Sequence, residues 1–441
     1  MSYSEETKGG DKDEISELML SLIEDGKNIF LTGSGGVGKS YYVKKLKEEL
    51  KGKKRIAITS TTGVSSYFLG GQTIHSFSGI GAFKGTESFE TVIKKVHKTK
   101  AAKENWKNFD IIVIDEISML GSKMLEMLDK IARYFREDDL PFGGIQVIFT
   151  GDFLQLPPIQ DSFAFLGKTW DTLDLQIIYL KKMYRFTDEV YAKMLERVRM
   201  AKHTQEDINL LQSRKKAYDE NKEKWEGYQP GEDGTDVLPT FMFSKKASVD
   251  EKNNAEMAKN TNKLMCFNPI FTEVKHTNEV RKKIEKEQDN PENVLYLKVG
   301  AQVMLNVNID VEDGLVNGSR GVVTKYNDDS GNLYVKFLDG REIPFTRHEY
   351  TYEEEGKVWY HISQYPFMLA YALSIHKTQG STLDYAIIDL GYSVFEDSMC
   401  YVALSRVRSL EGLFLKAFQP SRITTNKHAL NFYEELEENW E

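Results

Sequence analysis

The first third of the chain alternates short apolar runs with stretches of helical periodicity. Apolar residues recur at helical spacing between Asp13 and Asp25, which predicts an amphipathic helix, and a second helix is expected over Ser40–Leu50. Four short apolar runs predict buried strands: Asn28–Thr32, Arg55–Thr59, Ile111–Asp115 and Ile145–Thr150. Strands that alternate with helical segments are typical of a parallel sheet with crossover helices.

The second half shows a different pattern. From Ala201 to Val237 the chain is charged and rich in turn residues, so flexible or helical connecting material is expected there. Signals of an α/β domain resume in three segments: Thr240–Phe243, Ala386–Asp389 and Leu413–Leu415. Between them, β-forming runs separated by turns predict a small inserted β-barrel, with strands at Gly321–Tyr326, Leu333–Leu338 and Arg341–Phe345.

Length and composition narrow the class of protein. The chain has 441 residues, 40% hydrophobic and 28% charged, which predicts two or three globular domains. It has no apolar run long enough for a membrane span, and its polar, acidic N-terminus does not resemble a targeting peptide. We therefore expect an intracellular protein with no membrane partner, cytoplasmic or nucleoid-associated if its source is bacterial or viral. Only Cys266 and Cys400 are present, so a disulfide framework is not expected.

A phosphate-binding loop joins the second predicted helix to the strand before it. The motif G-x-x-x-x-G-K-S/T is matched by Gly33, Ser34, Gly35, Gly36, Val37, Gly38, Lys39 and Ser40. Glycines allow backbone N–H groups to surround phosphate oxygens at a helix N-terminus, a lysine neutralises the β- and γ-phosphates, and a hydroxyl ligates Mg²⁺. The sequence therefore predicts a nucleoside triphosphate site with Lys39 and Ser40 in these roles.

The strand Ile111–Asp115 ends in two carboxylates, Asp115 and Glu116. Downstream of a phosphate-binding loop, this arrangement predicts that Asp115 ligates Mg²⁺ and that Glu116 faces the attacking water. The two motifs together indicate an NTPase, but kinases, transporters and motor proteins share them.

Two loops after the second strand carry hydroxyls, glycines and a histidine. These groups are suited to holding a phosphodiester chain, and the candidate DNA ligands are Thr61, Thr62, Gly63, His75 and Ser76. Ordinary surface loops are the alternative. The lysine-rich segment Val92–Lys107 is likewise either a solvated helix face or a DNA-facing patch, because the net charge of −9 excludes a generally basic surface but not a local groove.

The predicted strand Ile145–Thr150 opens into an unusual loop, GDFLQLPP. Asp152 and Gln155 supply a carboxylate and an amide, and Pro157 and Pro158 stiffen the segment. Simple turn residues would be enough if the loop served packing alone.

In these motifs and their order, the chain resembles the Pif1-like branch of superfamily 1 DNA helicases. The similar segments extend from about Asn28 to Leu413 and read TSTTG, GGQTIHSFSGIG, IIVIDEISML, GDFLQLPP, LKVGAQVMLN, LVNGSRGVV, LSIHKTQGST and YVALSRVRSLEGL after the phosphate-binding loop. The most diagnostic stretch begins at Leu128–Arg133 and continues through Pro141–Val147, because related helicases of the RecD kind lack it.

The resemblance implies an α/β fold of two RecA-like P-loop domains, with an inserted SH3-like β-barrel and a small wedge subdomain. The implied domains are 1–175, which carries the wedge at about 82–107; 176–300 together with 364–441; and the barrel at 301–363. ATP is expected in the cleft between the RecA-like domains and single-stranded DNA across them.

The resemblance also assigns roles. Gln155 would sense the γ-phosphate, which accounts for the GDFLQLPP loop, and Arg185 and Arg406 would be arginine fingers. Gly380 would link nucleotide to DNA, and the neighbouring DNA ligands would be His376, Lys377 and Thr378. The cofactors would be ATP and Mg²⁺. The family usually has a glutamine upstream of the phosphate-binding loop that reads adenine, whereas no glutamine precedes Gln72 in this chain.

The implied activity is ATP-dependent, 5′→3′ translocation on single-stranded DNA with unwinding of duplexes, and also of G-quadruplex and RNA–DNA hybrid structures. The expected partners are single-stranded DNA and single-strand/duplex junctions, and the expected state is a monomer. Two alternatives stay open: a RecD-like subunit of a larger complex, and a protein that ATP switches between DNA-binding states without stepping.

Overall fold

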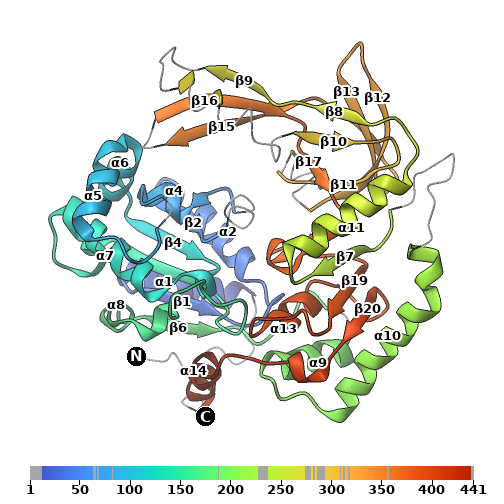
Figure 1. Ribbon diagram of the computed structural model, residues 1–441. Helices are drawn as coiled ribbons and strands as arrows, with labels where there is room; N and C mark the ends of the chain where they lie inside the picture. Colours follow the sequence, from blue (N-terminus) through green and yellow to red (C-terminus); the bar gives the residue numbers. More distant parts are fainter. Residues whose placement is uncertain are drawn as a thin grey trace. The chain divides into compact units, whose positions relative to one another are not determined.

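The protein forms two compact units (Figure 1). The first comprises Met1–Asp207, Glu396–Ser405 and Ile423–Glu441, and the second comprises Ile208–Phe395 and Arg406–Arg422. The structure, a computed structural model, describes residues 12–438 except for these segments: 63–65, 67–68, 82, 187, 227–236, 274–279, 282–283, 286–293, 308, 311–312, 316–317 and 355–356.

The first unit is built on a six-stranded parallel sheet. Its strands pair in the order β3 (Gln72–Thr73), β2 (Ile56–Ser60), β4 (Ile111–Asp115), β5 (Gln146–Gly151), β1 (Ile29–Thr32) and β6 (Gln176–Tyr179). Strands β1, β4, β5 and β6 are buried throughout, as expected for a parallel sheet covered on both faces. Four of these strands were predicted from the sequence within one residue at each end.

Helices cover both faces of this sheet. Alternate strand residues point to opposite faces, so Ile29 and Leu31 pack in one apolar cluster with the first two helices, and Phe30 packs in another with the helices of the opposite face. The helices of this unit are α1 (Lys12–Glu24), α2 (Lys39–Glu49), α4 (Ile74–Ser78), α5 (Phe89–Lys98), α6 (Lys100–Asn108), α7 (Ser122–Arg136), α8 (Lys168–Thr172), α9 (Glu189–Arg199), α13 (Met399–Leu404) and α14 (Lys427–Glu438). Short 3-10 turns lie at Ile117–Met119, Pro141–Gly144 and Ala164–Leu166.

The segment expected to form a wedge consists of α5 and α6. Both helices bury one face in the core of the first unit, where Val92, Val96 and Trp106 are fully buried. Trp106 packs edge-on against Phe77 at 5.2 Å, and its indole N–H donates to the Ser78 carbonyl at 3.2 Å. Their lysines project from the opposite faces, and a DNA-facing role for them stays a prediction.

The second unit contains a smaller parallel sheet in the order β18 (Ala372–Ser374), β7 (Thr240–Phe243), β19 (Ala386–Leu390) and β20 (Leu413–Phe418). Helix α10 (Gln205–Glu226) begins at the boundary between the units and packs Tyr218 and Trp225 against this sheet, and α11 (Lys246–Lys259) packs Val249 there. The charged connection expected after Ala201 is therefore largely helical.

An antiparallel insertion follows the β7–α11 segment. Five strands pair in the order β14 (Glu342–Phe345), β13 (Asn332–Phe337), β12 (Arg320–Asn327), β11 (Gln302–Leu305) and β17 (Phe367–Leu369). This sheet has its own core, which includes Val303, Val323 and Val335. The remaining strands form a three-stranded sheet of β15 (His348–Glu354), β16 (Lys357–Gln364) and β9 (Ile270–Glu273), and a pair of β8 (Met265–Phe267) and β10 (Leu295–Leu297).

The units differ from the domains implied at 1–175, 176–300 with 364–441, and 301–363. Strand β6 pairs with β1, which extends the first unit beyond 175. Helix α14 buries Tyr433 and Leu436 in the core of the first unit, so the C-terminal segment lies with that unit. Strand β17 continues the antiparallel sheet beyond 363.

No helix among the described residues is long and apolar enough to cross a membrane. Both cysteines are free thiols, with Cys266 exposed and Cys400 buried, which agrees with the expectation of no disulfide framework.

Replacing Trp106 tests whether α6 is an integral part of the first unit. Trp106→Ala should lower the free energy of unfolding by about 3 kcal/mol or more, because it leaves a large cavity in the core. Lys107→Ala, an exposed neighbour on the same helix, should change it by less than about 0.5 kcal/mol. Urea unfolding followed by circular dichroism measures both, and equal small effects would show that α6 packs loosely.

Candidate nucleotide and DNA sites

The phosphate-binding loop lies between β1 and α2 and takes a backbone form that requires glycine. Gly36 and Gly38 have φ values of 97° and 93°, and a Cβ at Gly36 would lie 2.5 Å from the Cβ of Arg185. The carbonyl of Gly36 accepts hydrogen bonds from the backbone N–H groups of Tyr184, at 3.0 Å, and Arg185, at 3.2 Å. The loop is therefore held against the predicted arginine finger Arg185.

Lys39 lies at the centre of this loop. Its ammonium group donates to the carbonyls of Gly33 at 2.6 Å and Ser34 at 3.0 Å. Burial lowers the pKa of Lys39, and the nearby carboxylates of Asp152, Glu116 and Asp115 act in the opposite direction. Asp115 ends β4, Glu116 follows it and Asp152 follows β5, so parallel pairing places these carboxylates at the edge of the sheet that carries the phosphate-binding loop.

Asp115 is the last residue of β4 and is almost fully buried, and Glu116 directly follows the strand. The hydroxyl of Thr150, at the end of the neighbouring strand β5, donates to the Asp115 carboxylate. Glu116 has a left-handed backbone with φ of 55°, a conformation that costs free energy for a residue other than glycine and that occurs often at active sites. This turn separates the two carboxylates at the end of the strand.

A fully buried ion pair anchors the GDFLQLPP loop. Asp152 accepts two hydrogen bonds from Arg199 in α9, at 2.8 and 2.9 Å, and both side chains are inaccessible to solvent. Burial would raise the pKa of Asp152, but the charge and hydrogen bonds of Arg199 outweigh it and hold that pKa below its ordinary value. Asp152 therefore serves as the buried counterion of Arg199, the last residue of α9.

Gln155 lies in the turn that Asp152 begins. Its backbone N–H donates to the Asp152 carbonyl at 3.0 Å, and its side chain is 4% exposed. Arg185 donates from its guanidinium to the Ser405 carbonyl at 3.1 Å. Their roles toward a γ-phosphate stay predictions.

The donor set fits a Mg²⁺–nucleotide complex. The N-cap of α2, Gly38, provides no side-chain hydrogen bond to the first turn of the helix, which suits that turn to bind phosphate. Ser40 is exposed in the first turn of α2, and Asp115 ends β4 at the same edge of the sheet; nucleotide phosphates commonly complete such a Mg²⁺ shell. Among the described residues no group of three His, Cys, Asp or Glu side chains could hold a metal alone. Mg²⁺ would here orient the phosphates and offset their charge.

The predicted DNA ligands of the first unit lie in the β2 loop and in α4. Thr61 donates its hydroxyl to the Glu116 carbonyl at 2.9 Å, so this loop is bonded to the residue that directly follows β4. Thr62 is half-buried, and Gly63 lies outside the described residues. Ser76 is exposed, whereas burial lowers the pKa of His75, which favours its neutral form.

The corresponding ligands of the second unit lie in a 3-10 turn at Ile375–Thr378. Lys377 is exposed and His376 half-buried, but Thr378 is buried and donates its hydroxyl to the Ile375 carbonyl at 2.8 Å. Gly380 is exposed with φ of 81°. Arg406, the second predicted finger, is 2% exposed.

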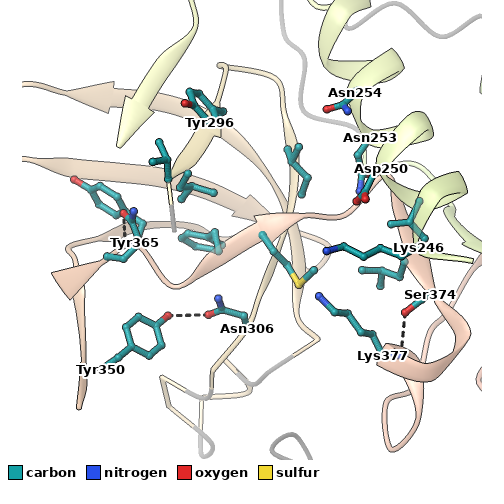
Figure 2. Close-up of a pocket in the computed structure, with 18 of the residues that line it drawn as sticks. Lys246, Asp250, Asn253, Asn254, Tyr296, Asn306, Tyr350, Tyr365, Ser374 and Lys377 are labelled. Carbon is teal, nitrogen blue, oxygen red and sulfur yellow. Dashed lines mark hydrogen bonds between the residues drawn. The ribbon is translucent and has the colours of Figure 1, made fainter. Parts of the chain in front are cut away.

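Beside Lys377 the second unit has a cavity of about 1020 Å³ (Figure 2). Figure 2 shows Lys246 and Lys377 directed into it from one side. The opposite side carries Tyr350, which donates to Asn306 at 2.9 Å, and Tyr365, and burial raises the pKa of both phenols to about 12. The cavity therefore combines two ammonium groups with neutral aromatic rings.

Known proteins resemble this chain over most of its length. The sequence profile of the PIF1-like helicase family matches residues 12–212, and that of the DNA helicase Pif1 2B domain matches residues 286–326. The ATP-dependent DNA helicase Pif1 of Bdellovibrio bacteriovorus is 32% identical over 95% of this chain and 90% of its own length. The chain belongs to the Pif1 family of helicases. The Pif1-like assignment made from sequence motifs is thus confirmed.

Other Pif1 proteins extend the comparison. PIF1 of Xenopus laevis is 35% identical over 95% of this chain, which spans 64% of that relative's length. The crystal structure of Candida albicans Pif1 has 31% identity and a TM-score of 0.78, and covers 96% of this chain and 98% of that one. A Bacteroides Pif1 in complex with ADP-AlF3 and ssDNA has 27% identity and a TM-score of 0.66, over 97% of each chain. The fold is therefore the Pif1 fold of two RecA-like domains.

Sequence analysis missed three groups that contact the candidate nucleotide site: Thr150, Arg199 and the helix α14. Thr150 could have been found, because parallel pairing of β4 with β5 sets it beside Asp115. Arg199 ends an amphipathic helix, where an arginine is by default a surface residue. The position of α14 depends on a contact between distant parts of the chain, which periodicity does not report.

Breaking the buried pair tests its role as an anchor. Asp152→Asn should lower the free energy of unfolding by about 3 kcal/mol, because it leaves Arg199 buried without its main counterion. Glu434→Gln, which breaks the exposed pair of Glu434 with Lys202, should cost less than about 1 kcal/mol. Urea unfolding measures both.

The same variants have a pH signature. Since the folded pKa of Asp152 is depressed, its stabilisation is present above the unfolded value of about 3.9 and is lost as pH falls through the folded pKa. The wild type should therefore lose stability more steeply on acidification below about pH 4 than Asp152→Asn does. Parallel pH profiles would contradict an ionised Asp152.

Proposed function

We propose that the chain is an ATP-dependent DNA helicase that moves 5′→3′ on single-stranded DNA, as a monomer, and separates duplexes at junctions. The observation that carries this proposal is the position of Asp115, Glu116 and Asp152 at the carboxyl ends of β4 and β5, next to β1 and its phosphate-binding loop, with Arg185 held against that loop in a Pif1-family chain. The Bacteroides relative in complex with ADP-AlF3 and ssDNA supports both ligand classes. G-quadruplex and RNA–DNA hybrid structures are further proposed substrates. The two free cysteines favour a reducing, intracellular site of action.

In this proposal, each residue of the nucleotide site has a separate role in ATP hydrolysis. Lys39 and the first turn of α2 bind the β- and γ-phosphates, and Ser40 and Asp115 would hold a Mg²⁺ ion that offsets phosphate charge. Glu116 orients the attacking water and accepts its proton. Arg185 and Arg406 offset charge on the transferring phosphoryl group, and Gln155 senses its presence.

The cavity beside Lys377 is the proposed path of the single strand through the second unit. Lys246 and Lys377 would meet phosphates, and exposed Tyr296 in its lining would stack on a base. Contacts of this kind are tolerant of sequence and weaken with salt.

Unwinding of tailed duplexes tests the function and its direction. The chain should open a duplex with a 5′ single-stranded tail in the presence of ATP and Mg²⁺, and should leave a duplex with only a 3′ tail intact. Lys39→Ala should abolish turnover and unwinding but retain single-stranded DNA binding, and Lys44→Ala, an exposed lysine of the same helix, should behave as wild type. ATP-dependent DNA binding without turnover would favour the switch alternative, and preferential opening from a 3′ tail would refute the polarity.

A variant of Gln155 distinguishes a role in sensing the γ-phosphate from a role in binding ATP. Gln155→Ala should leave ATP affinity nearly unchanged, because the phosphate-binding loop and Mg²⁺ supply most of it, while turnover falls on the order of 10²-fold. Unwinding should fall further than turnover if the loop also transmits domain closure. The number of ATP molecules hydrolysed per base pair opened measures this coupling, and an unaltered ratio in a folded variant would exclude the sensor role.

Variants of the cavity test the DNA path. Lys377→Ala should weaken single-stranded DNA binding about equally for all sequences and reduce the salt dependence by about one counterion. Tyr296→Ala should cost about 1 kcal/mol or more of binding with little change in salt dependence. Lys263→Ala removes an exposed lysine outside the cavity lining and should leave binding unchanged. Fluorescence anisotropy titrations at several salt concentrations distinguish these outcomes.

A further inference from the structure

Tyr433 lies at the point where the C-terminal helix meets the nucleotide site. It belongs to α14, is fully buried, and places its hydroxyl 2.5 Å from the Thr32 hydroxyl and 3.1 Å from the backbone nitrogen of Phe153. Thr32 is the last residue of β1, directly before Gly33 of the phosphate-binding loop. Phe153 directly follows Asp152 in the GDFLQLPP loop, two residues before Gln155.

The direction of each hydrogen bond follows from the donors present. Thr32 has one hydroxyl proton, which it donates to the Gly151 carbonyl at 2.9 Å. Tyr433 must therefore donate its own proton to Thr32, and its oxygen accepts from the Phe153 N–H group. The result is a continuous chain of donors and acceptors from Phe153 through Tyr433 and Thr32 to Gly151.

The surroundings keep this chain intact. Burial raises the pKa of Tyr433 well above its ordinary value, so the hydroxyl stays protonated and able to donate. The guanidinium of Arg199 lies 4.7 Å from the centre of the Tyr433 ring while it binds Asp152. The GDFLQLPP loop is thus fixed on one side by the ion pair and on the other by the tyrosine hydroxyl.

We propose that Tyr433 is a positioning residue for ATP hydrolysis. Its hydroxyl fixes the GDFLQLPP loop, and through it Gln155, in register with the phosphate-binding loop. This role rests on the proposed ATPase function. It adds that ATP turnover requires helix α14, although α14 contains none of the sequence motifs of the nucleotide site. Because small displacements of positioning groups cost far more in rate than in binding, the requirement concerns turnover rather than ATP affinity.

Tyr433→Phe is the direct test, because it removes the hydroxyl and keeps the buried ring beneath Arg199. The expected result is a fall in kcat of about tenfold for DNA-stimulated ATP turnover, with KM for ATP changed by less than about twofold. Tyr179→Phe is the matched control, because Tyr179 is a buried neighbour whose hydroxyl accepts a hydrogen bond from Arg199 at 3.4 Å. Removing the Tyr179 hydroxyl should leave kcat within about twofold of wild type.

A double-mutant cycle separates positioning from general loosening. Thr32→Val should reproduce the loss in kcat, Thr32→Ser should retain activity because it keeps the hydroxyl, and Thr32→Val with Tyr433→Phe should be no worse than either single variant. Two independent tenfold effects would instead multiply to about a hundredfold loss and would overturn the proposal. Urea unfolding of the same variants without nucleotide should show the same non-additivity, which tests the hydrogen-bond chain apart from activity.

The outcomes also separate this proposal from the proposed function. A wild-type chain without ATP turnover would overturn the function and with it the role of Tyr433 in hydrolysis. Wild-type kcat in Tyr433→Phe, beside an active wild type, would overturn the role of Tyr433 alone.

Discussion

A charged group removed from water has to find its counterion inside the protein, and this constraint organises the first unit. Arg199 is fully buried and is neutralised by Asp152, so α9 and the loop after β5 are bound to one another. Asp152 directly follows Gly151, which pairs with Thr32 at the end of β1, so the ion pair lies next to the start of the phosphate-binding loop. The Asp152 carboxylate therefore neutralises a buried arginine and also lies beside the candidate nucleotide site.

The parallel sheet explains why the charged groups near Lys39 come from distant segments of the chain. Parallel strands bring their carboxyl ends together, so β1 contributes the phosphate-binding loop, β4 the two carboxylates and β5 the GDFLQLPP loop. The ammonium of Lys39 donates to two carbonyls of its own loop, those of Gly33 and Ser34.

Local sequence patterns predicted much of this fold, because local periodicity and glycine placement determine single elements. Strand β4 was predicted at its observed bounds, and the phosphate-binding loop lies where its motif placed it. Contacts between distant segments were harder to predict: the pairing of β16 with β9 and the packing of α14 were not anticipated, since neither depends on a local pattern. The candidate DNA ligand Thr378 also shows what a motif does not report. It lies in the expected motif, but its hydroxyl donates to the Ile375 carbonyl.

The union of α14 with the first unit has a consequence for biosynthesis. Thr32 and Tyr433 are separated by 401 positions, so the phosphate-binding strand is made long before the tyrosine that completes its surroundings. A chain emerging from the ribosome can form most of the parallel sheet early, but the packing around the candidate nucleotide site has to wait until α14 has been synthesised. Contacts of such long range close slowly, and until then the apolar face that will receive α14 is exposed to other proteins. The phosphate-binding strand therefore acquires its complete surroundings only after α14 has been synthesised and has folded against it.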